Sequence, residues 1–298
     1  MSIGSCALKI LAIDTSGIQA SAAIVDVKSD AGDGASFCAE KYIPSSHTVI
    51  GEIFLNARTG EKQWTHSESL MPGVQSLFEL TRIQPQEVDY VAYSCGPGSF
   101  TGLRIGAACA LGIARALGRA AVGVPTLDAL ACNMHGVGGE AQVVPMLDAR
   151  RGQVYTAIYF RDAEGGLKNQ FEEAKIPEFV AMIIPVVTHQ LDFNRFFRGQ
   201  GGKPIILLGD GAIAYEKEIR RLFDQYNPKE ASNVFFAPAN NNHVRASSVA
   251  ICAANKILAN PDAFQNGTSG EVEILYVRAP QAVREKEAKE EKAKREAP

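Results

Sequence analysis

The amino-acid sequence predicts an α/β protein of two lobes, each a mixed β-sheet with flanking helices. Short apolar, β-branched runs alternate with helical patterns along the chain, which is typical of this fold class. One pattern, a strand that ends in Asp before a turn and a second strand, occurs at residues 8–27 and again at residues 143–160. A chain of 298 residues that is 46% apolar can also bury two cores. We therefore expect two lobes of similar construction.

The first hairpin is predicted from two apolar runs, residues 8–13 and 20–27, which flank a short polar turn. The tip of this hairpin carries Asp14, Thr15 and Ser16. The hairpin resembles the opening hairpin of the actin and sugar-kinase class of ATP-binding folds, which lies under the nucleotide phosphates. Ordinary turn chemistry explains the same residues equally well. Residues 28–50 then become polar and rich in Ser, Gly and Asp, so we expect an inserted loop or hairpin arm there.

Two helices and a glycine-rich turn complete the first lobe. Ser67 is a candidate N-cap for an amphipathic helix that runs to about residue 80. A buried strand at residues 88–93 leads into Gly96-Pro97-Gly98, and the Ala- and Leu-rich residues 102–117 predict a second helix. Glycines, hydroxyls and free amides at a helix start can hold an anion, although a capped tight turn accounts for them too. The candidate phosphate-binding residues are Asp14, Thr15, Ser16, Gly96, Gly98, Ser99 and Thr101.

The rest of the chain predicts a second, smaller lobe. Strand patterns occur at residues 120–124, 143–147, 154–160 and 204–208, and helical patterns at 126–135, 212–226 and 246–258. We place the first lobe at residues 1–120 and the second at 121–280, with its final helix a candidate to pack back on the first lobe. Residues 281–298 form a charged tail.

Composition excludes several classes of function. The net charge of −3 provides no basic footprint for an independent nucleic-acid binder. The six cysteines form no C-x-x-C pair and the five histidines no i, i+4 pair, so neither a zinc ribbon nor a metalloprotease is indicated, and we expect no metal site. The N-terminus lacks a signal-peptide pattern and no apolar run reaches about 18 residues, so we expect a cytoplasmic protein without a membrane contact.

Acidic residues at strand ends keep one enzymatic alternative open. Asp14, Asp148 and Asp210 each follow a predicted strand, where a Mg-ATP enzyme of the actin and sugar-kinase fold would place acids. A Mg-dependent ATPase or phosphotransferase is therefore the alternative function, with weak binding of ATP and Mg²⁺ as the corresponding cofactor expectation. The second lobe lacks a clear adenosine-binding glycine motif, which counts against this alternative.

Five motifs, taken in order along residues 8–283, resemble those of the TsaB family. These proteins are the dimerisation subunits of the bacterial machinery that makes N6-threonylcarbamoyladenosine at position 37 of tRNA. The motif at residues 96–106 is the specific one, and the others are weak singly. The motifs are ILAIDTS at 10–16, HSESLMP at 66–72, GPGSFTGLRIG at 96–106, DARRGQVY at 148–155 and YVR at 276–278.

The resemblance implies two actin-like lobes of the sugar-kinase and Hsp70 class and a non-catalytic role beside a TsaD-like transferase. The catalytic paralogue carries an H-x-x-x-H metal-binding helix, and this sequence has Thr126 and Leu130 at the matching positions, which cannot bind a metal. The resemblance also implies no cofactor bound by this chain alone, a TsaE-like ATPase and tRNA in the full complex, and a homodimer when the partner is absent.

The first two helices are the expected partner interface, because the resemblance implies that they form a helical bundle with their counterparts in the TsaD-like protein. Small residues on the second helix would permit close approach between helices. The apolar surface of the two helices exceeds what one lobe needs to bury, so we expect a partner face, and burial of the helices wholly within their own lobe is the alternative. The expected interface residues are Leu70, Val74, Leu77, Phe78, Arg104, Ala107, Ala110, Leu111 and Ala114.

Overall fold

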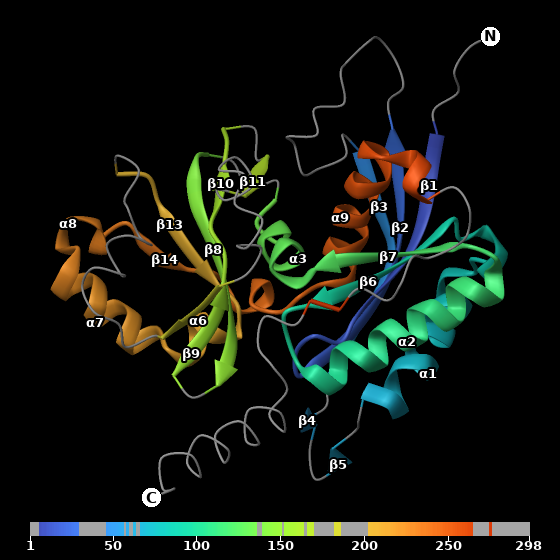
Figure 1. The fold of residues 1–298 in the computed structure, drawn as a ribbon, viewed down its shortest axis with the longest axis horizontal. Helices are drawn as coiled ribbons and strands as arrows, with labels where there is room; N and C mark the ends of the chain where they lie inside the picture. Colours follow the sequence, from blue (N-terminus) through green and yellow to red (C-terminus); the bar gives the residue numbers. More distant parts are fainter. Residues whose placement is uncertain are drawn as a thin grey trace, which may run out of the picture.

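The computed structural model shows two lobes, each built on its own β-sheet (Figure 1). It describes residues 6–29, 46–56, 58–59, 62–63, 66–135, 139–150, 152–163, 166–169, 182–185, 202–264 and 274–275. The charged tail at 281–298 lies outside the described residues.

The sheet of the first lobe has the strand order β3-β2-β1-β6-β7. The first three strands are antiparallel, since β1 and β2 form the expected hairpin, whereas β1, β6 and β7 run parallel. Parallel neighbours need helical crossovers, and the chain supplies them between β3 and β6 and between β6 and β7. The strands are β1 (Cys6–Asp14), β2 (Gln19–Ser29), β3 (Ser46–Asn56), β6 (Tyr90–Gly96) and β7 (Ala120–Pro125).

The sheet of the second lobe repeats this plan along the path β12-β9-β8-β13-β14. Strands β12, β9 and β8 are antiparallel, and β8, β13 and β14 are parallel. The repeated order and directions confirm the predicted α/β class with two similar lobes. The strands are β8 (Ala141–Arg150), β9 (Gln153–Thr156), β10 (Tyr159–Arg161), β11 (Leu167–Asn169), β12 (Met182–Pro185), β13 (Ile205–Leu208) and β14 (Val234–Phe236).

Helices cover both faces of the first sheet, because alternate residues of its strands point to opposite sides. Leu11 and Ile13 pack with helices α1 (His66–Thr81) and α2 (Phe100–Leu117), whereas Ile10 and Ala12 pack with α9 (Ala246–Ala259). Helix α9 follows β14 in the chain and yet lies on the first sheet, where Figure 1 shows it beside β1 and β2.

The second sheet is covered by shorter helices. Helix α3 (Thr126–Cys132) contacts β8 and α9 and lies between the two sheets in Figure 1. One apolar core therefore runs from the first sheet through α9 and α3 to the second sheet. The remaining elements are α6 (Asp210–Ala214), α7 (Glu216–Tyr226), α8 (Pro228–Ala231), the ribbon β4 (Arg58–Thr59) and β5 (Lys62–Gln63), and 3-10 turns at Pro85–Glu87, Ala239–Asn241 and Pro261–Phe264.

The bounds of the expected insertion at residues 28–50 need correction. Strand β2 continues to Ser29, and β3 begins at Ser46 and pairs with β2 over almost its full length. Polar and charged residues in this stretch concealed an edge strand, one flank of which is open to solvent and tolerates such residues. Only residues 30–45 remain of the expected insertion, and they lie outside the described residues.

Candidate functional site

The hairpin tip between β1 and β2 lies directly against the start of helix α2. The hydroxyl of Thr15 donates a hydrogen bond to the carbonyl of Gly102 at 2.7 Å, and the amide of Ser99 donates to the carbonyl of Ser16 at 2.7 Å. Ser99 is the N-cap of α2, since its hydroxyl accepts from the amide of Gly102 at 3.2 Å. The structure therefore brings together Thr15, Ser16 and Ser99, three residues of the candidate phosphate-binding set.

The glycines of this turn allow the hairpin tip to pack closely against the start of α2. A Cβ on Gly98 would lie 2.6 Å from the carbonyl oxygen of Ser16, and one on Gly102 would lie 2.1 Å from that of Thr15. A Cβ on Gly106 would lie 2.2 Å from the hydroxyl oxygen of Thr15. The backbone and side chains of the hairpin tip thus occupy the space beside the α2 start that these glycines create.

Gly96 has a different neighbour from the other glycines of the turn. Its φ of +117° favours glycine, and a Cβ would lie 2.6 Å from the carbonyl oxygen of Leu275. The amide of Leu275 donates to the carbonyl of Cys95 at 2.7 Å. The chain near its C-terminus therefore crosses the end of β6, while Thr101 on the first turn of α2 is exposed to solvent.

Asp14 lies at the end of the central strand β1 and is buried. Burial raises the pKa of the Asp14 carboxyl, and polar groups of Ser94 and Ser16 oppose that rise. The raised pKa works against ionisation of this carboxyl, and the ionised form is the one that binds Mg²⁺.

The two acids of the second lobe contact each other through the backbone. The amide of Asp148 donates to the Asp210 carboxylate at 2.9 Å, and burial raises the pKa of Asp210. Asp148 itself accepts from the Tyr215 hydroxyl at 3.1 Å and pairs with Arg150 at 3.0 Å. Protein groups therefore surround both acids. In the described part of the chain, no group of three or more His, Cys, Asp or Glu side chains could hold a metal ion.

The expected partner interface requires a correction, because most of its residues face inward. Helix α1 turns its apolar stripe toward the sheet, and α2 turns its small residues the same way. Their side chains are 0–3% exposed, so a partner cannot reach them while the lobe stays folded. The helical periodicity identified the buried stripe correctly, but that stripe serves the lobe's own core. The six buried residues are Leu70, Val74, Leu77, Ala107, Ala110 and Ala114.

The outer surface of α1 and α2 nevertheless carries large apolar side chains. Met71 is 43% exposed, Leu80 is 77% exposed and Phe100 is 36% exposed. The Arg104 guanidinium stacks on the Phe100 ring, with its carbon 3.9 Å from the ring centroid. We call the exposed or half-exposed residues Met71, Phe78, Phe100, Arg104, Leu111 and Gly112 the docking face. The sequence offered one signal for the residues we missed, namely their position opposite the buried stripe.

Gly112 is unusual among the residues of the docking face. It lies in the interior of α2 and is exposed, and apart from its chain neighbours and the helix's own backbone no atom of the described residues lies within 4 Å of the place where a Cβ would be. Glycine in a helix interior costs about 1 kcal/mol relative to alanine, and no contact within the described residues requires it here. Among the described helices, α2 is also long and apolar enough to cross a membrane by length and composition, but its buried side packs on the first sheet.

This chain is similar to known proteins both in sequence and in fold. The TsaB protein of Escherichia coli is 36% identical over 116 residues, or 39% of this chain and 50% of that protein. The TsaB protein of Bacillus subtilis is 28% identical over 197 residues, or 63% of this chain and 77% of that protein. The match thus spans about half the length of the E. coli relative.

The solved structure of YeaZ from Pseudomonas aeruginosa shares the fold, with a TM-score of 0.60 at 19% identity over 91% of this chain and all of that one. Residues 60–293 match the family model described as TsaD, tRNA N6-adenosine threonylcarbamoyltransferase. The chain therefore belongs to this family, and within it the chain resembles the TsaB proteins.

Proposed function

We propose that this chain is a non-catalytic subunit of the assembly that forms N6-threonylcarbamoyladenosine at position 37 of tRNA. In this proposal the docking face binds a TsaD-like paralogue, and a TsaE-like ATPase and tRNA join the complete complex. The chain alone binds no cofactor, forms a homodimer when the paralogue is absent, and works in the cytoplasm.

The exposed apolar surface of α1 and α2 is the observation that carries this proposal. An exposed apolar patch shared by two neighbouring helices is typical of a surface that another protein covers. Helix pairs of this kind associate by packing ridges into grooves, and Gly112 would let a partner helix approach closely. The sequence relatives are named for tRNA threonylcarbamoyladenosine biosynthesis, which supports the proposed pathway. The docking face gives the chain a surface that can bind another subunit.

Two features support the absence of catalysis by this chain. Thr15 and Ser16 pack directly against the glycines at the α2 start, on the side where these glycines leave room. Thr126 and Leu130, at the positions matching the metal ligands of the catalytic paralogue, are both completely buried in α3. The Thr126 hydroxyl accepts a hydrogen bond from the amide of Gly96 at 3.2 Å, so it serves the turn rather than a metal.

Co-purification with the TsaD-like protein of the same cell tests the docking face. Met71→Glu and Arg104→Glu change the charge at exposed residues of this face and alter no residue of the buried stripe, and we expect each to weaken binding at least tenfold. Ile213→Asp is the matched control, because Ile213 is 51% exposed on α6 of the second lobe. Undiminished binding by both docking-face variants would refute the interface.

Nucleoside mass spectrometry of bulk tRNA tests the biosynthetic role. Depletion of this chain from its own cell should remove N6-threonylcarbamoyladenosine, and the unaltered chain should restore it. If the modified nucleoside persists after depletion, the proposed function is wrong.

A further inference from the structure

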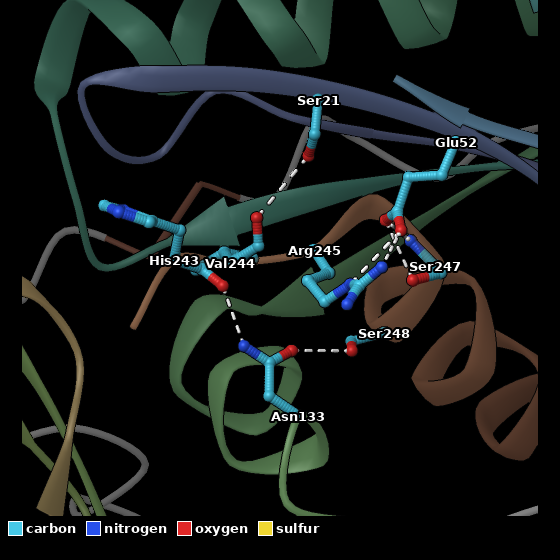
Figure 2. Close-up of polar contacts among 8 residues, drawn as sticks. All are labelled: Ser21, Glu52, Asn133, His243, Val244, Arg245, Ser247 and Ser248. Atoms are coloured by element: carbon cyan, nitrogen blue, oxygen red, sulfur yellow. Dashed lines mark hydrogen bonds and ion pairs between the residues drawn. The ribbon is translucent and has the colours of Figure 1, made fainter. Parts of the chain in front are cut away.

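Glu52 is a buried carboxylate on the first sheet that holds the segment leading into helix α9. Its side chain is only 6% exposed. It accepts hydrogen bonds from Arg245 at 2.5 and 3.1 Å and from the amide and hydroxyl of Ser247 at 2.9 and 2.8 Å. Figure 2 shows both residues converging on this one carboxylate. We call Glu52, Arg245 and Ser247 the Glu52 latch.

The latch caps a helix from outside that helix. Arg245 is the N-cap residue of α9, and its own side chain makes no capping hydrogen bond. The first turn of α9 contains no acidic residue, so Glu52 provides both the acceptor for a free helix amide and the negative charge that the helix dipole favours there. The start of α9 is therefore fixed by a residue from a strand far away in the sequence.

Strand β3 places the latch back to back with helix α1. A Cβ on Gly51 would lie 2.9 Å from the Leu77 side chain of α1, and one on Gly73 of α1 would lie 2.7 Å from the side chain of Ile53. Residues 51 and 53 thus face α1, whereas Glu52 points to the opposite side of the strand. The same strand that supports the docking face holds the latch.

The segment before α9 is also fastened on its other side. The Asn242 side chain accepts from the amide of Gly209, directly after β13 of the second sheet, at 2.8 Å. The Asn133 side chain donates to the carbonyl of His243 at 2.7 Å and accepts from the Ser248 hydroxyl at 2.8 Å, as Figure 2 shows. Residues 242–248 therefore connect β3 of the first lobe to α3 and β13, which adjoin or belong to the second lobe.

We propose that Glu52 is a positioning residue that fixes the second lobe relative to the docking face, so that both lobes are presented to the assembly as one rigid body. A chain segment that is bound on both sides acts as a strut and not as a hinge, because bending it would break charge-assisted hydrogen bonds of a buried carboxylate. This inference concerns the free chain, and it rests on the proposed function only for the meaning of the docking face.

Glu52→Gln is the decisive variant. The side chain keeps its shape, but a neutral amide that accepts from Ser247 must turn its own N–H donors toward the Arg245 guanidinium, which has no acceptor. We expect hydrogen exchange at the amide of Ser247 to accelerate about tenfold, because its hydrogen bond then has a neutral acceptor in place of a charged one. Distances between spin labels at residues 86 and 217, attached through encoded non-cysteine amino acids, should change from one narrow population to a broader distribution.

Controls separate the latch from a general loss of stability. Glu79→Gln removes the same charge from the exposed surface of α1 and should leave both measurements unchanged. Ser247→Ala removes one hydroxyl bond and should give the same changes to a smaller extent, which keeps the test valid if Glu52→Gln fails to fold. Acceleration of exchange throughout the chain, or an unchanged distance distribution in both latch variants, would overturn the proposal.

Binding to the TsaD-like protein distinguishes this inference from the proposed function. Glu52→Gln leaves every residue of the docking face in place, so we expect it to bind the paralogue with unchanged affinity. If the unaltered chain does not bind the paralogue, the proposed function fails and the latch still stands on the distance measurement. If binding is normal and the distances do not change, the latch fails alone.

Discussion

Replacing Gly112 by alanine should stabilise the free chain and weaken the complex. Apart from its chain neighbours and the backbone of its own helix, no atom of the described residues lies within 4 Å of a Cβ at this position, so the new methyl group causes no clash. Alanine in a helix interior is favoured over glycine by about 1 kcal/mol, and we expect the free energy of unfolding to rise by about 0.5–1 kcal/mol. In the complex the methyl group would overpack a close helix contact, at a cost of about 1–3 kcal/mol, or about 5- to 150-fold in Kd.

Two measurements on the same preparation test this pair of opposite effects. Urea denaturation gives the stability of the free variant, and calorimetric titration with the TsaD-like protein gives its Kd. An inert surface position would show the gain in stability with no change in affinity. That result would refute close helix approach at Gly112, and a loss of stability would refute the open environment of this residue in the free chain.

Three further predictions concern the hairpin tip and its surroundings. Gly106→Ala, on the same helix, should lower the unfolding free energy by about 1–3 kcal/mol in urea denaturation, because its methyl group would displace the Thr15 hydroxyl from its hydrogen bond with Gly102. Equal stability of this variant and the unaltered chain would contradict the packing described. Asp14→Asn should stabilise the chain at pH 7, because burial raises the pKa of the Asp14 carboxyl in the folded state. The unfolded state releases this proton first, so the stability of the unaltered chain falls as pH rises from 3.8 through the folded pKa. Equal stability profiles of the two chains between pH 4 and 7 would exclude this effect. Calorimetric titration of the chain alone with MgATP should show no binding, because Thr15 and Ser16 pack directly against the α2 start. A saturable heat of binding at micromolar MgATP would restore the phosphotransferase alternative.

The fold class followed from the sequence because strand and helix periodicities are local. The apolar runs and polar turn of the first hairpin and the capped turn at the start of α2 all act within a few residues. The sequence predicts only a loop or hairpin arm over the first part of strand β3, because half of the residues of this strand face solvent or take part in polar contacts, as Glu52 does. Its place in the sheet depends on pairing with β2, which no local pattern encodes.

The candidate sites divide in the same way. The sequence by itself determined which residues form the hairpin tip and the glycine turn, and which stripe of each helix is apolar, because these properties depend on side-chain type and spacing. Only the tertiary structure decided that the apolar stripe is buried against the lobe's own sheet and that Met71, Phe100 and Gly112 stay exposed to solvent. It also decided that the glycines of the turn pack against Thr15 and Ser16, and that Glu52 accepts a hydrogen bond from Ser247, which lies 195 positions away in the chain. Burial and long-range contact depend on how distant elements pack, and that information is spread over the whole chain.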